Sequence, residues 1–195
     1  MIQTFPTVAF PVVSRGGEAN WHTPASGEVT SPLAADWLFD PGSLTAKLKQ
    51  HSQHFAVQLL GQYEADLLDD EQVWLGAPQR CVIREVILWC DDAPWVFARS
   101  VFPLQALAQQ QLKLEQLGNR PLGEHLFKQP DLVRSEVEIS SFTADSKVGR
   151  LHQQLGYPAT ELWGRRSRFT AAQQHVLVAE VFIGASPLAQ EVNRG

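Results

Sequence analysis

The segment Cys81–Trp89 constrains the fold of this chain more than any other. It is rich in β-branched and aromatic residues and is bounded by turn-forming residues, which predicts a strand. Successive side chains of a strand point to opposite faces of the sheet, and both faces of this segment are mainly apolar. Each face must therefore be covered by other parts of the chain. One face carries Val82, Val86 and Leu88, and Arg84 lies among them.

Arg84 needs an anion, because a guanidinium keeps its charge and is costly to bury unpaired. The residue pattern leaves two kinds of anion open. The first is an internal carboxylate, and the candidates are Glu180, Glu85, Glu136 and Glu138. The second is a ligand in a closed cavity, where Arg84 would bind a ligand carboxylate and Glu180, itself on an apolar strand face, would accept a hydrogen bond from a hydroxyl.

The rest of the sequence predicts an α+β fold with a mainly antiparallel sheet of six strands. Five further segments have strand patterns: Phe55–Leu67, Pro94–Phe102, Val133–Phe142, Leu162–Phe169 and His175–Ile183. A short polar turn joins the second of these to Cys81–Trp89, which predicts an antiparallel hairpin. Val73–Leu75 is a further candidate for the start of another strand.

Four helices are expected, two before the first strand and two between the third and fourth strands. Ser31 and Ser43 are suitable N-caps for two short helices separated by Asp40–Gly42. Leu104–Leu117 is amphipathic at the helical period, and Pro121–Phe127 forms the next short helix. The acidic residues that end the first strand are expected in a solvated turn, with a metal site as the less favoured alternative; they are Asp66, Asp69, Asp70 and Glu71.

Length and composition indicate a single domain. The chain has 195 residues with 44% hydrophobic content, enough for one core. We expect an irregular arm over residues 1–31 and one domain over residues 32–195.

The net charge of −5 disfavours nucleic acid as a partner. Neither a signal peptide nor an apolar run of about 18 residues is present, so we expect no membrane span.

Cysteine and motif usage point to a reducing compartment and to no bound cofactor. Cys81 and Cys90 lie at opposite ends of one predicted strand, about 30 Å apart, and so cannot pair with each other. We expect two reduced thiols and a cytoplasmic location. The histidines show no metal-ligand spacing, and the chain has neither a glycine-rich phosphate loop nor a nucleophile elbow. We therefore expect neither metal nor cofactor.

Several segments, in this order, resemble the chorismate pyruvate-lyase family. The resemblance spans residues 36–188 and rests on the ordered set rather than on one motif. The segments are Asp36–Leu38, Ser43–Thr45, Arg84–Leu88, Arg99–Pro103, Pro121–Gly123 with Leu126–Phe127, Trp163–Ser167, Glu180–Phe182 and Ala185–Leu188.

The resemblance implies a fold and an activity. Members have a six-stranded antiparallel sheet, with helices that form flaps over a buried ligand site. They convert chorismate to 4-hydroxybenzoate and pyruvate, an early step of ubiquinone biosynthesis, and do so as monomers, without a cofactor and under inhibition by their own product. By position, Arg84 matches the residue that binds the ring carboxylate and Glu180 the residue near the 4-hydroxyl. Leu122 matches a flap leucine that contacts the ligand through its backbone. Leu44 stands where a family member has methionine, and we expect it to line the pocket with a slightly altered wall.

Three questions stay open at this level. Chorismate has a second carboxylate, for which Arg99, Arg166 and Arg168 are the candidates. Glu180 either takes a proton from the substrate or only positions it. A ligand sensor of the same fold, without catalysis, is the alternative function, although such sensors normally carry a DNA-binding helix-turn-helix that the first residues here do not resemble. A structural module in which Arg84 is neutralised internally is the third possibility.

Overall fold

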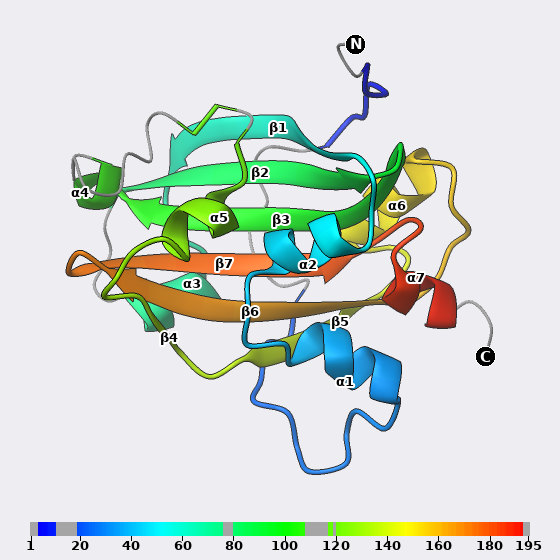
Figure 1. Cartoon of the computed structure of the whole chain (residues 1–195), viewed down its shortest axis with the longest axis horizontal. Coiled ribbons are helices and arrows are strands. Elements are labelled where there is room, and N and C mark those ends of the chain that lie inside the picture. Colours follow the sequence, from blue (N-terminus) through cyan, green and yellow to red (C-terminus); the bar gives the residue numbers. More distant parts are fainter. Residues whose placement is uncertain (1–3, 11–18, 76–79, 108–116, 119, 193–195) are drawn as a thin grey trace.

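The computed structural model describes residues 4–10, 19–75, 80–107, 117–118 and 120–192. Within them, seven strands form one antiparallel sheet in the order β1-β2-β3-β7-β6-β4, and β5 also pairs with β6 (Figure 1). The strands are β1 (Phe55–Ala65), β2 (Cys81–Cys90), β3 (Ala93–Pro103), β4 (Val133–Arg134), β5 (Glu138–Phe142), β6 (Leu162–Ala171) and β7 (Gln174–Phe182). The predicted α+β class and antiparallel sheet are confirmed.

The sheet has one strand more than predicted because the segment Val133–Phe142 is divided. Its two ends, β4 and β5, both pair with β6, but their registers differ by one residue. At the break, the Ser135 hydroxyl accepts a hydrogen bond from the backbone N–H of Arg168 at 2.9 Å. A side chain therefore replaces one backbone acceptor of the ladder, which interrupts the strand.

Two tight turns fix the central hairpins. The β2–β3 turn consists of Asp91 and Asp92, with φ of 49° and 64°, and the β6–β7 turn consists of Ala172 and Gln173, with φ of 49° and 59°. Two successive left-handed residues make the type I′ turn, whose twist matches that of the paired strands. Aspartate tolerates this conformation well, whereas alanine and glutamine adopt it less readily.

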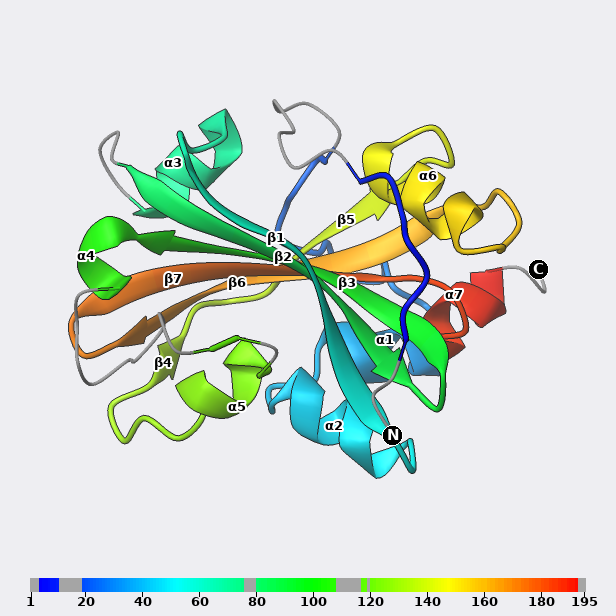
Figure 2. The same cartoon turned by 90° about the horizontal axis from the view of Figure 1, so that it is seen from above.

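Helices lie on both faces of the sheet. They are α1 (Pro32–Leu38), α2 (Leu44–Gln50), α3 (Asp69–Leu75), α4 (Leu104–Leu107), α5 (Leu122–Leu126), α6 (Lys147–Gln154) and α7 (Pro187–Val192). Figure 2 shows α2 and α5 on one side of the sheet and α3 and α6 on the other. No helix among the described residues is long and apolar enough to cross a membrane. The Ser31 and Ser43 hydroxyls cap α1 and α2, as predicted.

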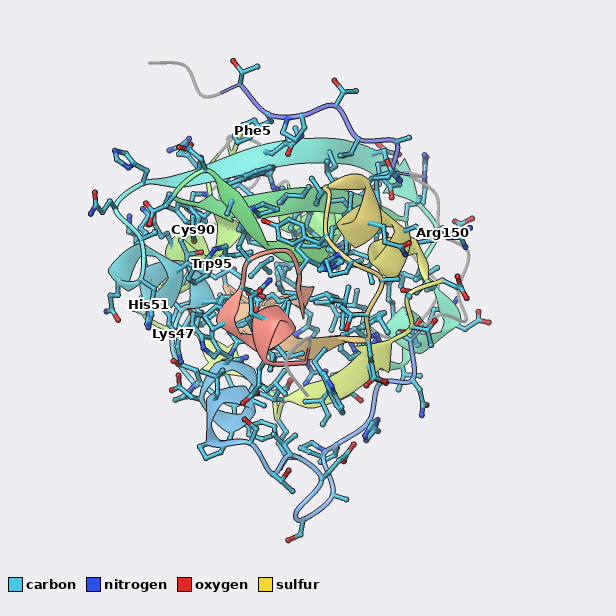
Figure 3. All side chains as sticks on the ribbon, turned by 90° about the vertical axis from the view of Figure 1, so that its right-hand side faces the viewer. Phe5, Lys47, His51, Cys90, Trp95 and Arg150 are labelled. Carbon is cyan, nitrogen blue, oxygen red and sulfur yellow. The ribbon has the colours of Figure 1, made fainter. Side chains whose placement is uncertain are left out.

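A lysine of α2 binds α1 and the segment that connects the two helices. Lys47 Nζ lies 2.9 Å from the Asp36 carboxylate and 3.0 Å from that of Asp40, and it stands over the ring of Trp37. Trp37 is 1% exposed and packs edge-on against Phe182. These contacts fix both short helices against the sheet, and Figure 3 shows Lys47 on α2 at this side of the molecule.

Both cysteines are buried free thiols, as predicted. Burial raises the pKa of each to about 11, so both stay protonated near neutral pH. They behave as small apolar side chains at the two ends of β2.

Two local predictions were wrong, and one is answered only in part. The segment Asp69–Leu75 is the helix α3, so Val73–Leu75 is not a strand. Glu71 is 4% exposed rather than solvated, because it binds Arg99. Of the predicted helix Leu104–Leu117, α4 covers the first turn, and residues 108–116 lie outside the described part.

The described N-terminal residues pack on the face of the sheet that carries α3 and α6. The ring of Phe5 lies 5.5 Å from that of Trp89, and Trp21 contacts Phe142 edge-on at 5.6 Å. The backbone of His22 forms a bridge with Ile139 of β5. The division into an arm over residues 1–31 and a domain over 32–195 stays a prediction.

His152 gives the fold a predictable pH dependence. It is 0% exposed, burial lowers its pKa below the usual 6.5, and its Nδ1 accepts a hydrogen bond from the Gly184 N–H at 3.0 Å. The imidazole of His152 therefore takes up a proton more readily in the unfolded chain than in the folded one. Its contribution to the free energy of unfolding is complete above about pH 6.5 and is lost as the pH falls. Urea unfolding should show a larger loss between about pH 7.5 and 5.5 for the wild type than for His152→Asn. Equal losses would contradict this.

Candidate functional site

Arg84 is buried and, among the residues that the structure describes, forms no ion pair with a carboxylate. It is 2% exposed, and burial lowers its pKa. Its Nη1 donates to the Gln62 side-chain oxygen at 3.2 Å, and its Nη2 donates to the backbone carbonyls of Gly118 at 2.7 Å and Arg120 at 3.3 Å. Among the described residues, no Asp or Glu forms an ion pair with it.

The glutamates proposed as internal partners of Arg84 form no ion pair with it in the described part of the chain. Glu85 binds Arg99 on the other face of the sheet, Glu138 binds Arg166, and Glu136 forms no ion pair among the described residues. The interpretation that Arg84 is neutralised from within is therefore wrong for the part of the chain described. A buried guanidinium held only by neutral oxygens has remaining affinity for an anion.

Glu180 binds Arg165 rather than Arg84. Arg84 of β2 lies opposite Ser100 of β3, which lies opposite Val178 of β7. Glu180 is therefore two strands away from Arg84 and two residues beyond Val178 along β7. This places the two backbones about 10 Å apart across the sheet and about 7 Å along it. Arg165 directly opposes Glu180, and its Nε donates to Glu180 Oε2 at 2.8 Å.

Two adjacent cavities lie on this face of the sheet, each about 30 Å³. We call the first the Arg84 cavity; Arg84, Leu122 and Glu180 are in its wall. We call the second the Arg165 cavity; its wall includes Leu44, Phe169, Arg165 and Glu180. Gly123, Val178 and Glu180 line both. The structure thus brings together all four residues predicted for the site, around two neighbouring cavities that share part of their walls.

The helices α2 and α5 cover these cavities and touch each other. A Cβ atom on Gly123 of α5 would come within 3.0 Å of the Thr45 hydroxyl of α2, so glycine permits the close contact. Lys49 and Glu124 form an ion pair between the same two helices. Figure 1 shows α2 and α5 side by side in front of the sheet. They occupy the position expected of the flaps.

Arg99, Arg166 and Arg168 do not reach this site. Side chains alternate along β6, so Arg166 and Arg168 point away from the face that carries Arg165. Arg168 stands over the ring of Trp74 in α3, on the far side of the sheet. Arg99 is on the far side too, since it binds Glu85, which follows Arg84 in β2. None of the three predicted candidates can hold a ligand beside Arg84.

A larger cavity, about 100 Å³, lies on that far side and includes Arg99 and Arg166 in its wall. These two arginines are already neutralised by carboxylates. Arg99 Nε donates to Glu71 at 2.8 Å. Burial alone would lower the pKa of Arg99, but the hydrogen bond to Glu71 and the charges of Glu71 and Glu85 together outweigh burial and raise it. Arg166 binds both Glu138 and Asp70. The smaller cavities therefore offer the better anion site.

Sequence comparisons agree with this geometry. The sequence model of the chorismate lyase family matches residues 16–193. The chain belongs to the chorismate lyase family. It is 41% identical over 189 residues to "Probable chorismate pyruvate-lyase" of Idiomarina loihiensis, covering 97% of this chain and 96% of that protein. It is 39% identical over 177 residues to the protein of the same name in Pseudoalteromonas translucida, covering 90% and 96%.

Solved structures of transcriptional regulators share the fold of this chorismate lyase family member. PhnF of Mycobacterium smegmatis matches with a TM-score of 0.55 and 14% identity, over 73% of this chain and 64% of PhnF. The ligand-binding domain of a GntR-family regulator from Bordetella bronchiseptica matches with a TM-score of 0.51 and 13% identity, over 68% and 84%. At such identities the likeness concerns the fold alone.

Proposed function

We propose that this protein is a chorismate pyruvate-lyase that splits chorismate into 4-hydroxybenzoate and pyruvate. One observation carries the proposal beyond family membership: Arg84 is buried, faces a cavity and has no carboxylate partner among the described residues. A planar guanidinium binds a carboxylate through two parallel hydrogen bonds. The ring carboxylate of chorismate is the anion proposed for it.

In this proposal the substrate ring lies between Arg84 and Glu180. The ring carboxylate and the 4-hydroxyl of chorismate are at opposite ends of the ring, so one end meets Arg84 while the other meets Glu180. Glu180 Oε2 is held by Arg165, which leaves Oε1 to accept a hydrogen bond from the hydroxyl. Leu122 and Leu44 line the apolar walls. The helices exclude water, which strengthens every charged contact inside.

The reaction breaks the bond between ring carbon 3 and the enolpyruvyl oxygen and removes the hydrogen on ring carbon 4. The ring becomes aromatic, and the released enolpyruvate takes up one proton and becomes pyruvate. The two products together contain all the atoms of chorismate, so the balance needs neither oxidant nor reductant. We therefore propose that positioning and electrostatic stabilisation suffice and that no cofactor takes part.

Simultaneous measurement of both products tests the function. The purified protein is mixed with chorismate in excess chelator, and 4-hydroxybenzoate and pyruvate are quantified over time. We expect both to appear at equal rates, at a rate proportional to protein concentration. Tight binding of 4-hydroxybenzoate without turnover would instead support a ligand sensor. Absence of both turnover and binding would reject the proposed site.

The ion pair between the flap helices predicts an effect on product release. Lys49 and Glu124 are partly exposed, and such pairs contribute about 0.2–1 kcal/mol. If product leaves when α2 and α5 separate, Glu124→Gln should speed release of 4-hydroxybenzoate by up to about fivefold. Stopped-flow displacement of bound product measures this rate. High salt should bring the wild type to the rate of the variant, and a slower release in the variant would contradict the prediction.

The same proposal places the protein in a pathway and a compartment. Its product would enter ubiquinone biosynthesis, where it would also inhibit the enzyme by occupying the closed site. We propose that it acts in the cytoplasm as a monomer, because the site is assembled from residues of one chain. Sedimentation with and without 4-hydroxybenzoate tests the oligomeric state.

A further inference from the structure

The second carboxylate of chorismate, on the enolpyruvyl group, still needs a partner, and this inference rests on the proposed function. We propose that the Arg165 cavity receives the enolpyruvyl group and that Arg165, with Arg134 beside it, binds its carboxylate. Arg99, Arg166 and Arg168, which the sequence suggested, are on the other side of the sheet.

The shape of the substrate selects the Arg165 cavity. The enolpyruvyl oxygen is attached to the ring carbon next to the one that carries the hydroxyl. The enolpyruvyl group therefore leaves the ring at the end that meets Glu180, away from Arg84. The two cavities share Glu180, Val178 and Gly123, so the Arg165 cavity lies at that same end.

Arg165 is placed to contact the carboxylate directly. It is 1% exposed and lies in the cavity wall. Its Nε donates to Glu180, and its Nη1 donates to the backbone carbonyls of Trp37 at 3.0 Å and Asp40 at 3.1 Å. Its Nη2 forms no hydrogen bond with the residues that the structure describes. It is also not among the fully buried polar atoms that lack a partner. One donor group of this guanidinium thus remains for a ligand.

Arg134 provides the charge that a second anion requires. Arg165 alone is balanced by Glu180. Arg134 Nη1 donates to the same Asp40 carbonyl as Arg165, at 2.9 Å, so the two guanidinium groups are neighbours. Burial and the charge of Arg165 lower the pKa of Arg134. The group Arg134, Arg165 and Glu180 therefore carries one net positive charge next to the cavity.

Among the other groups near Arg134, the Asp40 carboxylate offsets part of this positive charge, and its effect raises the pKa of Arg134. Its Nε donates to the Ser167 hydroxyl at 3.0 Å, and its guanidinium stands over the ring of Phe169, which is in the wall of the Arg165 cavity. No Asp or Glu of the described chain forms an ion pair with Arg134. The Asp40 carboxylate forms its ion pair with Lys47, which it shares with Asp36.

Binding of two stable aromatic ligands tests the inference without relying on turnover. One is 4-hydroxybenzoate, which has only the ring carboxylate. The other is 4-hydroxybenzoate with a 1-carboxyethoxy group on carbon 3, which adds a carboxylate where the enolpyruvyl group would be. Affinities are measured by calorimetry for the wild type, Arg134→Gln and the control Arg80→Gln. Arg80 is an exposed arginine, so its variant loses the same charge away from the site.

We expect Arg134→Gln to bind the dicarboxylate about tenfold more weakly and to bind 4-hydroxybenzoate within about twofold of the wild type. Arg80→Gln should bind both ligands as the wild type does. Arg165→Lys, which keeps the charge but loses the planar fork, should also weaken mainly the dicarboxylate. Equal weakening of both ligands in Arg134→Gln, or no weakening of either, would overturn the inference. Failure of the proposed function would instead appear as a wild type that binds both ligands but does not convert chorismate.

Discussion

Arg84→Gln should bind 4-hydroxybenzoate about 10²- to 10⁴-fold more weakly than the wild type, because two charge-assisted hydrogen bonds of about 1.5–3 kcal/mol each are lost. The same change should raise the KM for chorismate while the protein stays folded. Fluorescence titration with 4-hydroxybenzoate measures the first effect, and Trp37, whose carbonyl accepts a hydrogen bond from Arg165, supplies the signal.

Stability separates this role from a structural one. In the structure described, Arg84 donates only to neutral oxygens, so its removal breaks no ion pair. We expect the free energy of unfolding of Arg84→Gln to change by less than about 1.5 kcal/mol, whereas loss of a buried ion-pair partner costs about 3–5 kcal/mol. Arg84→Lys is the matched control: it keeps the charge, loses the bidentate geometry and should recover only part of the affinity. If Arg84→Gln bound 4-hydroxybenzoate as tightly as the wild type, the proposed role of Arg84 in ligand binding would be wrong.

Arg165→Met should have the largest effect on stability, a loss of about 3–5 kcal/mol, because it leaves the Glu180 carboxylate without its partner in a mostly buried position. Two backbone carbonyls, those of Trp37 and Asp40, lose a donor in the same variant. Urea unfolding at neutral pH measures the loss.

A double-mutant cycle identifies the source of that loss. Glu180→Gln is combined with Arg165→Met, and the coupling energy is obtained from the four stabilities. If the ion pair accounts for the effect, the double variant should be more stable than the sum of the single changes predicts. Additive losses would mean that the carbonyl contacts of Arg165, and not Glu180, explain its importance. Both single variants should also lose activity, since each disturbs the group that faces the substrate hydroxyl.

Local pattern was sufficient to predict the part of the site that lies on β2. The alternation over Cys81–Trp89 put Arg84 on an apolar face, and Asp91 and Asp92 are residues that a hairpin turn accepts. Both facts depend only on neighbours in sequence. The structure adds the neutral oxygens that hold Arg84, which come from Gln62 and from the backbone of Gly118 and Arg120, all distant from it in the chain.

The pairing of Glu180 with Arg165 was missed although it is nearly local. A two-residue turn at Ala172 and Gln173 sets these residues opposite each other in the β6–β7 hairpin. Neither turn residue is the Asn, Asp or Gly that usually marks such a turn, so the register was not predicted. An explicit test of two-residue turns between the two predicted strands would have found the pair.

The prediction of a solvated turn at the acidic segment was wrong for a different physical reason. Asp69, Asp70 and Glu71 have the composition of a solvated turn, yet they form the first turn of α3, where negative charge is favourable. Their partners, Arg99 and Arg166, come from β3 and β6. Such ion pairs between distant segments depend on tertiary packing and have no signature in the local sequence.

A crystal structure of the protein with 4-hydroxybenzoate tests the central claim most directly. The account predicts that the ligand lies under α2 and α5, with its carboxylate on the Arg84 guanidinium and its hydroxyl on Glu180. A ligand bound on the other side of the sheet, against Arg99 and Arg166, would contradict the proposed site. It would also mean that the buried charge of Arg84 serves the fold alone.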